Sequence, residues 1–440
     1  MNSKERLALA EWAIKFAKEK GADDAKVSIR NGRDIEIKFR DRKLENLKES
    51  TSNSLSLNIY ANNRYSGHST SDMRTDALEK FIEEAVSATK YLSEDEFRKL
   101  PDPKYYPIDL SVDLQLVDNN YENVTSDQRK KIAQDIEEAT LSKSDKIISA
   151  ECGYNDSYNE SVQVHSNGFV GERATTSFWA GSSVTVKDDN GGRPEDWYWG
   201  GSRFFNGIPS PEIIGKEAAS RALRKIGQSK IESGKYDIIV ENRAGGRLVG
   251  MFNRPLSARA LQQKSSYLEG MIGKKIASDK LTVIDDPFVK KAFGSKLYDG
   301  DGIAARKKVV IEKGILNHYY VDAYYGKKLG MEPNCSSPTN ILFEYGDKGF
   351  EEIIKEIKKG IFVTGFIGGN SNSTTGDFSF GLVGQLVENG EIVKPVNELN
   401  LTGNANEFWN QIVNVGNDPY PYSSWKIPTL HFTLADISGL

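Results

Sequence analysis

Apolar residues near the start of the chain recur at a helical spacing. Four of them lie three or four positions apart, namely Leu7, Ala10, Ile14 and Ala17. This period predicts an amphipathic helix over residues 3–20, capped by Ser3 at its start and ended by Gly21. The same reasoning predicts further helices over residues 75–92, 128–141 and 211–227.

Between these helices apolar and polar residues alternate, which is typical of strands. Residues 25–50 and 54–70 alternate in this way around Asn31-Gly32 and Asn62-Asn63, and these pairs predict hairpin turns. Residues 147–187 contain further β-rich runs, with another turn at Asn167-Gly168. Three prolines within residues 100–110 break regular structure and predict a surface crossing.

A different pattern begins near Lys235. Residues 235–241, KYDIIVE, form a short apolar run of the kind found in buried strands, and from Val283 onward strands predominate. One helix is predicted over residues 349–359, and glycine turns suggest a closed or nearly closed sheet. We therefore expect an α+β fold, with an N-terminal α+β domain with an antiparallel sheet over residues 1–234 and a β-rich, barrel-like C-terminal domain over residues 235–440.

Composition narrows the classes of function. The chain has 440 residues, of which 27% are charged and 38% hydrophobic, as in a soluble globular protein with no membrane association. A net charge of −4 and the lack of long Lys or Arg runs argue against direct nucleic-acid binding. The first residues lack a secretory signal, and the two cysteines form no CxxC pair, so a reducing cytoplasm is expected.

Familiar catalytic motifs are missing from the sequence. The four histidines, His68, His165, His318 and His431, begin no HExxH helix and are interpreted as isolated surface or turn residues. No GxSxG occurs. Cys152 is expected to be a buried structural thiol, and Cys335 a more accessible loop thiol.

Two acidic pairs and one aromatic cluster leave alternatives open. The pairs Asp285-Asp286 and Asp299-Asp301 are interpreted as solvated loop charges, although such pairs can also bind cations. The cluster DWYWGGSRFF, residues 196–205, is compatible with a ligand platform and equally with a packed or lid-like hairpin.

The stretch FIGGNSNSTTGDFSFG, residues 366–381, is rich in small and polar residues. It has no lysine and runs into a strand-like pattern, which excludes a phosphate loop of the GxxxxGK[ST] type. The apolar run before it, together with Phe378 and Phe380, argues against a flexible linker. We expect a glycine-shaped bend between two strands, whose backbone groups could pair with an extended peptide.

This stretch also carries a resemblance to a known family. GGNSNSTTGDFSFG at residues 368–381, VENGEI at 387–392 and VGND at 415–418 resemble the signature of the TldD/TldE (PmbA) family, the so-called modulators of DNA gyrase. The hairpins at residues 50–73 and 164–172 and the segment 299–330 are similar to other family motifs, so the resemblance runs nearly end to end.

The resemblance implies an α+β N-terminal domain and a β-rich C-terminal domain, assembled as a dimer around an internal cavity. In this family the TldD partner holds zinc through an HExxxH helix and a cysteine and hydrolyses peptides, whereas TldE lacks the metal site. The corresponding helix here, residues 241–257, has no histidine, and Glu241 cannot replace two imidazoles. Residues 417–432 supply no cysteine.

The sequence therefore resembles TldE. This implies a non-catalytic subunit of a zinc metallopeptidase that acts on unfolded or extended peptides, with no cofactor in this chain and zinc in a TldD-type partner. The alternative is a homodimeric peptide-binding or scaffold protein with no proteolytic role. A direct gyrase or nucleic-acid effector is disfavoured by the acidic pI of about 5.8.

The expected contact surface lies within the signature. Glycines shape the bend, hydroxyls are offered to a ligand, and the aspartate orients the loop; the residues are Gly368, Gly369, Asn370, Thr374, Thr375, Gly376, Asp377 and Phe378. The same residues are equally compatible with a demanding strand connection that binds nothing.

Overall fold

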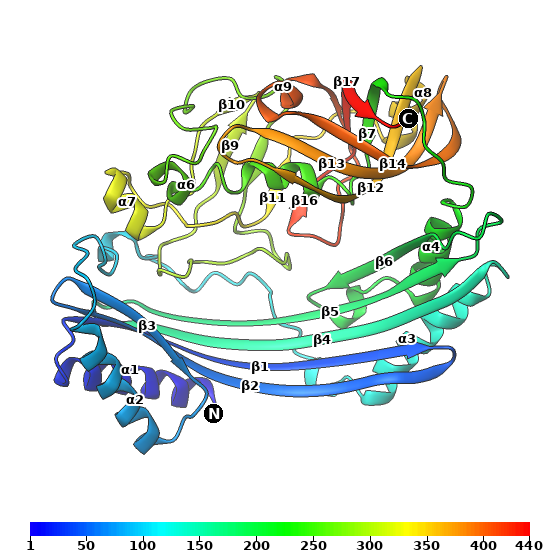
Figure 1. The fold of residues 1–440 in the computed structure, drawn as a ribbon. Coiled ribbons are helices and arrows are strands. Elements are labelled where there is room, and N and C mark those ends of the chain that lie inside the picture. Colours follow the sequence, from blue (N-terminus) through cyan, green and yellow to red (C-terminus); the bar gives the residue numbers. More distant parts are fainter.

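A long antiparallel sheet forms the base of the N-terminal half. The structure, a computed structural model, describes residues 1–440. Six strands pair in the order β3-β2-β1-β4-β5-β6, and two of them are 19 residues long. Figure 1 shows the sheet as a curved layer beneath the C-terminal half of the chain. Its strands are β1 (Asp24–Arg40), β2 (Lys43–Ala61), β3 (Arg64–Thr70), β4 (Ile147–His165), β5 (Val170–Val186) and β6 (Glu195–Ser202).

Four helices cover one face of this sheet. Alternate residues of β1 point to that face. Val27 and Ile29 pack into a core with α1 and α2, and Ile35 and Ile37 pack into a second core with α3 and α4. Both pairs are odd-numbered, so the two cores lie on the same side of the strand. The helices are α1 (Ser3–Glu19), α2 (Thr75–Thr89), α3 (Ser126–Leu141) and α4 (Pro211–Leu223).

The opposite face of the sheet is polar and lies toward the C-terminal half (Figure 1). On β2, Ser54 and Ser56 alternate with the buried residues Leu55 and Leu57. On β4, the polar face of the sheet carries Asn155, Ser157 and Asn159. Near β6 the ring of Trp199 packs over Gly181 and Gly153, where an added Cβ would lie 2.1 and 2.8 Å from its atoms. The aromatic cluster of residues 196–205 is thus largely a packed edge strand.

Two local predictions were wrong. Asn2, and not Ser3, caps α1, because its side chain accepts from Glu5 N while Glu5 returns the bond in a capping box. No turn occurs at Asn31-Gly32, since β1 runs through it; Gly32 leaves room for Asn159, whose Oδ1 would lie 2.9 Å from an added Cβ. The turn instead lies at Asp41 and Arg42, which both have positive φ.

Other predicted elements are present with shifted ends. The turns at Asn62-Asn63 and Asn167-Gly168 are confirmed, and α2 and α4 end three or four residues before the predicted positions. The proline-containing crossing is irregular apart from two 3₁₀ turns, at Pro103–Tyr105 and Tyr121–Asn123. None of the helices is both long and apolar enough to cross a lipid bilayer.

The C-terminal half is built on a closed barrel, as the glycine turns suggested. Its strands run in the order β14-β13-β12-β7-β17, and β14 pairs with β17 through Asn400–Thr402 to close the ring. Short β15 extends the sheet beside β17. The strands are β7 (Gly234–Val240), β12 (Lys359–Ser371), β13 (Asp377–Glu388), β14 (Glu391–Asn404), β15 (Ile412–Val415) and β17 (Leu430–Ser438).

A second, smaller sheet packs against the barrel. Its strands run in the order β10-β9-β8-β11-β16, and one core of 43 buried residues spans both sheets. These strands are β8 (Val283–Asp285), β9 (Lys308–Glu312), β10 (Ile315–Leu316), β11 (Ile341–Phe343) and β16 (Trp425–Lys426). Short helices lie between the strands of the C-terminal half, and a further 3₁₀ turn, Phe205–Gly207, follows β6 in the N-terminal half. The helices are α5 (Gly246–Val249), α6 (Ala258–Gln262), α7 (Ala323–Leu329), α8 (Phe350–Lys355) and α9 (Ala405–Phe408), with 3₁₀ turns at Gly250–Phe252 and Trp409–Gln411.

A buried ion cluster joins the two halves where β7 ends. Asp196 of β6 accepts from Arg243 at 3.0 Å and pairs with Lys225 at 3.1 Å. Arg221 of α4 donates to Glu241 Oε1 at 2.7 Å. Burial alone would raise the pKa of Asp196, but Arg243, Lys225 and Arg221 together hold it below its ordinary value.

Replacing Asp196 should therefore destabilise the whole protein. Asp196→Asn leaves buried cations uncompensated, and we expect the free energy of unfolding to fall by about 3 kcal/mol, measured by denaturant titration at pH 7. The matched control is Asp189→Asn, whose 84% exposed side chain pairs with Lys146; its cost should stay below about 1 kcal/mol.

The parent chain and the Asp196→Asn variant also allow a test of the pH dependence of stability. Because the folded-state pKa of Asp196 is lowered, its stabilisation is present above about pH 4 and is lost as the pH falls through that pKa. The gap in stability between the parent chain and Asp196→Asn should shrink in acid. A gap that grows in acid would contradict this assignment.

Candidate functional site

The glycine-rich bend connects β12 to β13 at one end of the barrel. Two glycines near the end of β12 have left-handed backbone, Gly368 at φ 66° and Gly369 at φ 85°, and the pairing register shifts between Ile367 and Asn370. An added Cβ on Gly369 would lie 2.1 Å from the carbonyl oxygen of Ser379 on β13. Only glycine fits at this close approach.

Hydrogen bonds within the turn fix its shape. Thr375 Oγ1 donates to Asp377 Oδ2 at 2.6 Å, and Asn404 Nδ2 donates to Asp377 Oδ1 and to Thr375 O, both at 2.9 Å. The bonds from Thr375 and Asn404 hold the pKa of Asp377 below its ordinary value. Gly376, at φ 86°, lies against Asn404. Asp377 is therefore engaged in holding the loop.

The signature residues divide between solvent and core. Six of them are exposed: Gly368, Gly369, Asn370, Thr374, Thr375 and Asp377. Gly376 is buried, and Phe378 packs into the barrel core with ring centroids 5.3 Å from Phe380 and 5.2 Å from Phe408. Phe378 thus anchors the bend to the barrel core, while Gly368, Gly369 and the two threonines face solvent.

Beside the bend, β12 has an open edge. Its pairing with β7 covers only Gly360–Val363, after which β7 ends and residues 364–371 have no neighbouring strand on that side. Ile367 on this stretch is 50% exposed. An open strand edge presents backbone N–H and C=O groups that can pair with an extended chain.

Arg247 of α5 contacts this edge at Gly369. Its Nη2 donates to Gly369 O at 2.5 Å, and its guanidinium lies 4.6 Å from the centroid of the Phe380 ring. Sequence reasoning missed this residue, because nothing in the local pattern around residue 247 indicates a contact with residues more than a hundred positions away.

Segment 241–257, where an HExxxH motif would fall, does not fit a zinc ion. Its one carboxylate, Glu241, accepts from Arg221 and lies 3.6 Å from Arg243 Nε. Asn242 Nδ2 donates to the backbone oxygen of Asp418 at 2.7 Å. The side chains of Glu241 and Asn242 are therefore already bonded, the first to arginines and the second to a backbone oxygen. No group of three or more His, Cys, Asp or Glu is arranged to hold a metal elsewhere in the chain.

The histidines lie far apart, but two of them are buried, contrary to prediction. His165 packs against Tyr106, whose hydroxyl is 2.9 Å from Nδ1, and burial lowers the pKa of this imidazole to about 3. His431 lies beside Asn414 at 3.1 Å, and its pKa is also lowered by burial. Both ring nitrogens of His165 have a hydrogen-bonding neighbour, since Gln163 Nε2 lies 2.8 Å from its Nε2, whereas His431 has one at Nδ1 alone.

Cys335, Asp285 and Asp299 are also buried. The predictions of an accessible thiol at Cys335 and of solvated loop charges at the two aspartates were therefore wrong. Cys152 is buried as expected, but Cys335 is only 1% exposed, and burial raises the pKa of its thiol. Asp285 accepts from Thr339 N at 2.9 Å, and Asp299 accepts from the backbone N–H of Ser336 at 2.9 Å. Both carboxylates organise loops of the second sheet from inside.

The fold and the bend agree with comparisons to known protein families. Three family models match successive parts of the chain: PmbA/TldA metallopeptidase domain 1 over residues 25–89, the central domain over residues 119–226 and the C-terminal domain over residues 233–439. The chain belongs to the PmbA/TldA metallopeptidase family.

Individual relatives cover almost the whole chain. The metalloprotease PmbA of Escherichia coli O157:H7 is 28% identical over 409 residues, which is 92% of this chain and 90% of that protein. A crystal structure from Bacteroides thetaiotaomicron, described as a candidate modulator of DNA gyrase, is 38% identical with a TM-score of 0.97 and covers 100% of both chains. TldE from Thermococcus kodakarensis shares the fold, with a TM-score of 0.84, 21% identity and coverage of 98% of this chain and 100% of that one.

A graded series of glycine substitutions tests the geometry of the bend. Gly369→Ala combines a positive φ with a clash against Ser379 O and should lower the free energy of unfolding by about 2 kcal/mol or more. Gly368→Ala meets no atom within 4 Å and should cost only about 1 kcal/mol for its left-handed backbone.

Gly246→Ala in α5 is the matched control, because its added Cβ also meets nothing within 4 Å and its backbone is helical. It should cost nothing measurable, since alanine is the better helix former. Denaturant titration of the three variants gives the order, and equal stability of Gly369→Ala and Gly246→Ala would refute the described geometry.

Proposed function

We propose that this chain is a non-catalytic subunit that pairs with a zinc-bearing HExxxH relative to form a peptidase for unfolded or extended peptides. The observation that carries the proposal is segment 241–257. Its only carboxylate is held by arginines, and it contains no imidazole to bind a metal. A peptidase that uses zinc to activate water and polarise the scissile carbonyl needs such ligands, so the metal would have to come from the partner.

The contribution of this chain to the complex would be a surface that holds the peptide. The open edge of β12, residues 364–371, lies directly beside segment 241–257 and beside the exposed threonines of the bend. Pairing along a strand edge uses backbone groups, so it accepts many sequences provided that the chain is extended. This property favours unfolded substrates over folded ones.

A second open edge supports assembly with another chain. β3 covers only Leu55–Ala61 of β2, so residues 43–54 of β2 have β1 on one side and no strand on the other. Leu44 and Leu47 on this stretch are each 46% exposed. An unpaired edge of this length is a ready surface for strand pairing between subunits.

The test is cleavage of an unstructured peptide by this chain, by an HExxxH relative encoded in the same genome, and by their mixture, each with and without chelator. We expect cleavage only in the mixture, and we expect chelator to abolish it. A mixture in which glutamine replaces the HExxxH glutamate of the relative is the control for contaminating proteases.

Each outcome decides between the candidate functions. Chelator-sensitive cleavage by this chain alone would contradict the proposal. A stable homodimer that binds the peptide, with no cleavage in any mixture, would instead support the alternative of a peptide-binding or scaffold protein.

A further inference from the structure

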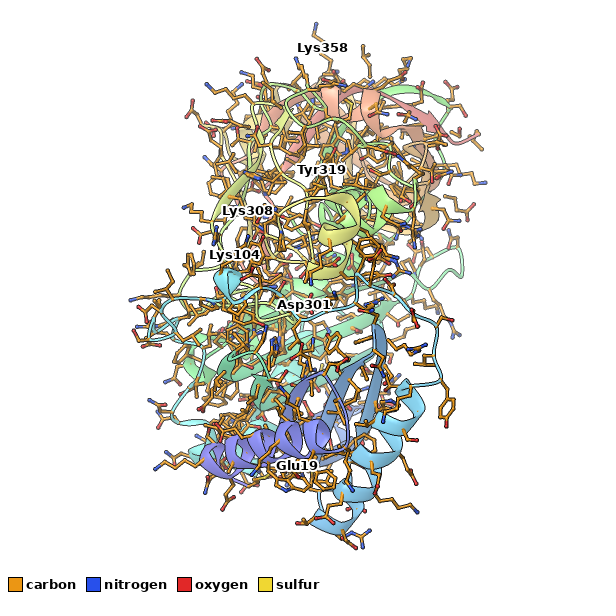
Figure 2. All side chains as sticks on the ribbon, turned by 90° about the vertical axis from the view of Figure 1, so that its left-hand side faces the viewer. Glu19, Lys104, Asp301, Lys308, Tyr319 and Lys358 are labelled. Carbon is orange, nitrogen blue, oxygen red and sulfur yellow. The ribbon has the colours of Figure 1, made fainter.

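A polar cavity of about 210 Å³ lies where three parts of the chain meet, away from the bend. One wall is the end of the long sheet, the second is the irregular crossing after α2, and the third comes from the C-terminal half at α7. The residues that matter are Lys26, Tyr60, Tyr65, Arg98, Asp301 and Asp322. Figure 2 shows Asp301 between α1, which ends at Glu19, and the C-terminal layer that carries Tyr319.

Arg98 brings an unbalanced positive charge to this cavity. Its guanidinium lies 3.5 Å from the ring centroid of Tyr324 and 4.9 Å from that of Tyr65, and it forms no ion pair with a carboxylate. Both rings are themselves held, since Tyr324 donates to Asp95 at 2.6 Å and Tyr65 Oη accepts from Asn58 at 2.7 Å. The two tyrosines fix the cation in place without neutralising it.

The wall from the C-terminal half carries an excess of negative charge. Asp301 pairs with Lys26 at 3.3 Å, but Asp322 has no cationic partner and uses Oδ1 to cap α7 through Tyr325 N at 2.8 Å. Burial, and after it the nearby carboxylate of Asp301, raise the pKa of Asp322. Within ion-pair distance these two carboxylates have a single lysine, Lys26, so a ligand cation would be stabilised there.

The cavity also offers a polar group without a partner. Tyr60 lies at the sheet end between these two walls, and its hydroxyl makes no hydrogen bond within the chain. Burial raises the pKa of Tyr60, so this hydroxyl stays protonated and can both donate to and accept from a ligand. A guanidinium without an ion pair, two carboxylates with a single lysine at ion-pair distance and a hydroxyl without an intramolecular hydrogen bond therefore line one space, together with Lys99.

We propose that this cavity binds a small zwitterion, a free amino acid or a dipeptide, with its carboxylate on Arg98 and its ammonium group toward Asp301 and Asp322. The size fits, because a cavity of about 150 Å³ already accommodates benzene. The inference is independent of the proposed peptidase complex, since every lining group belongs to this chain and no partner is needed.

Calorimetric titration of the full chain with alanyl-alanine tests the proposal. We expect saturable binding that weakens about tenfold or more when the amine is acetylated, and again when the carboxylate is made an amide, because each change removes a charge-assisted contact. Arg98→Gln should weaken alanyl-alanine binding by about tenfold and abolish the preference for acid over amide. Arg193→Gln, in the exposed loop between β5 and β6, is the matched control and should bind as the parent does.

A second variant keeps the test open if Arg98→Gln fails to fold by circular dichroism. Asp322→Asn still caps α7, but it should lose the preference for a free amine over an acetylated one. Absence of binding, equal binding of all three forms of the ligand, or an acid preference that survives Arg98→Gln would overturn the proposal. Because this chain is tested alone, such a failure leaves the cleavage experiment on the complex unaffected.

Discussion

Side-chain alternation along the long sheet is the constraint on which the rest of the structure depends. Every second residue of a strand points to the same face, so four helices buried on one face leave a continuous polar face on the other. The C-terminal half lies over that polar face (Figure 1). Side-chain ion pairs join it to the two ends of the sheet. The fastening at one end is the Asp196 ion cluster, and at the other it includes the Lys26–Asp301 pair.

These two fastenings differ in how completely their charges are balanced. Asp196 faces three cations and is held ionised, and Arg221 is matched by Glu241. That end is a structural joint, and it occupies the segment where a zinc motif would fall. At the opposite end Arg98 and Asp322 are left without ion-pair partners, which is costly unless a ligand or solvent reaches them. The charged side chains without an ion-pair partner, Arg98 and Asp322, therefore lie away from segment 241–257.

Much of the fold could be predicted from the sequence, because the predicted features depend on local period and turn chemistry. The first helix, the Asn62-Asn63 turn, the barrel and the glycine bend all follow from such patterns. The turn predicted at Asn31-Gly32 was wrong, because Gly32 leaves room for the side chain of Asn159 on a neighbouring strand. Cys335, Asp285 and His165 were placed at the surface because burial of a polar residue depends on partners distant in sequence. Arg247 and Arg98 were missed for the same reason, as their contacts arise only from tertiary packing.

The central claim is that this chain supplies surface and its partner supplies the metal. The most direct test is the zinc content of the purified chain, of the HExxxH relative and of their complex after dialysis, measured by mass spectrometry of the metal. The account predicts about one zinc ion per complex and a background level in this chain alone. A stoichiometric amount of zinc in this chain alone, lost together with activity on chelation, would contradict it.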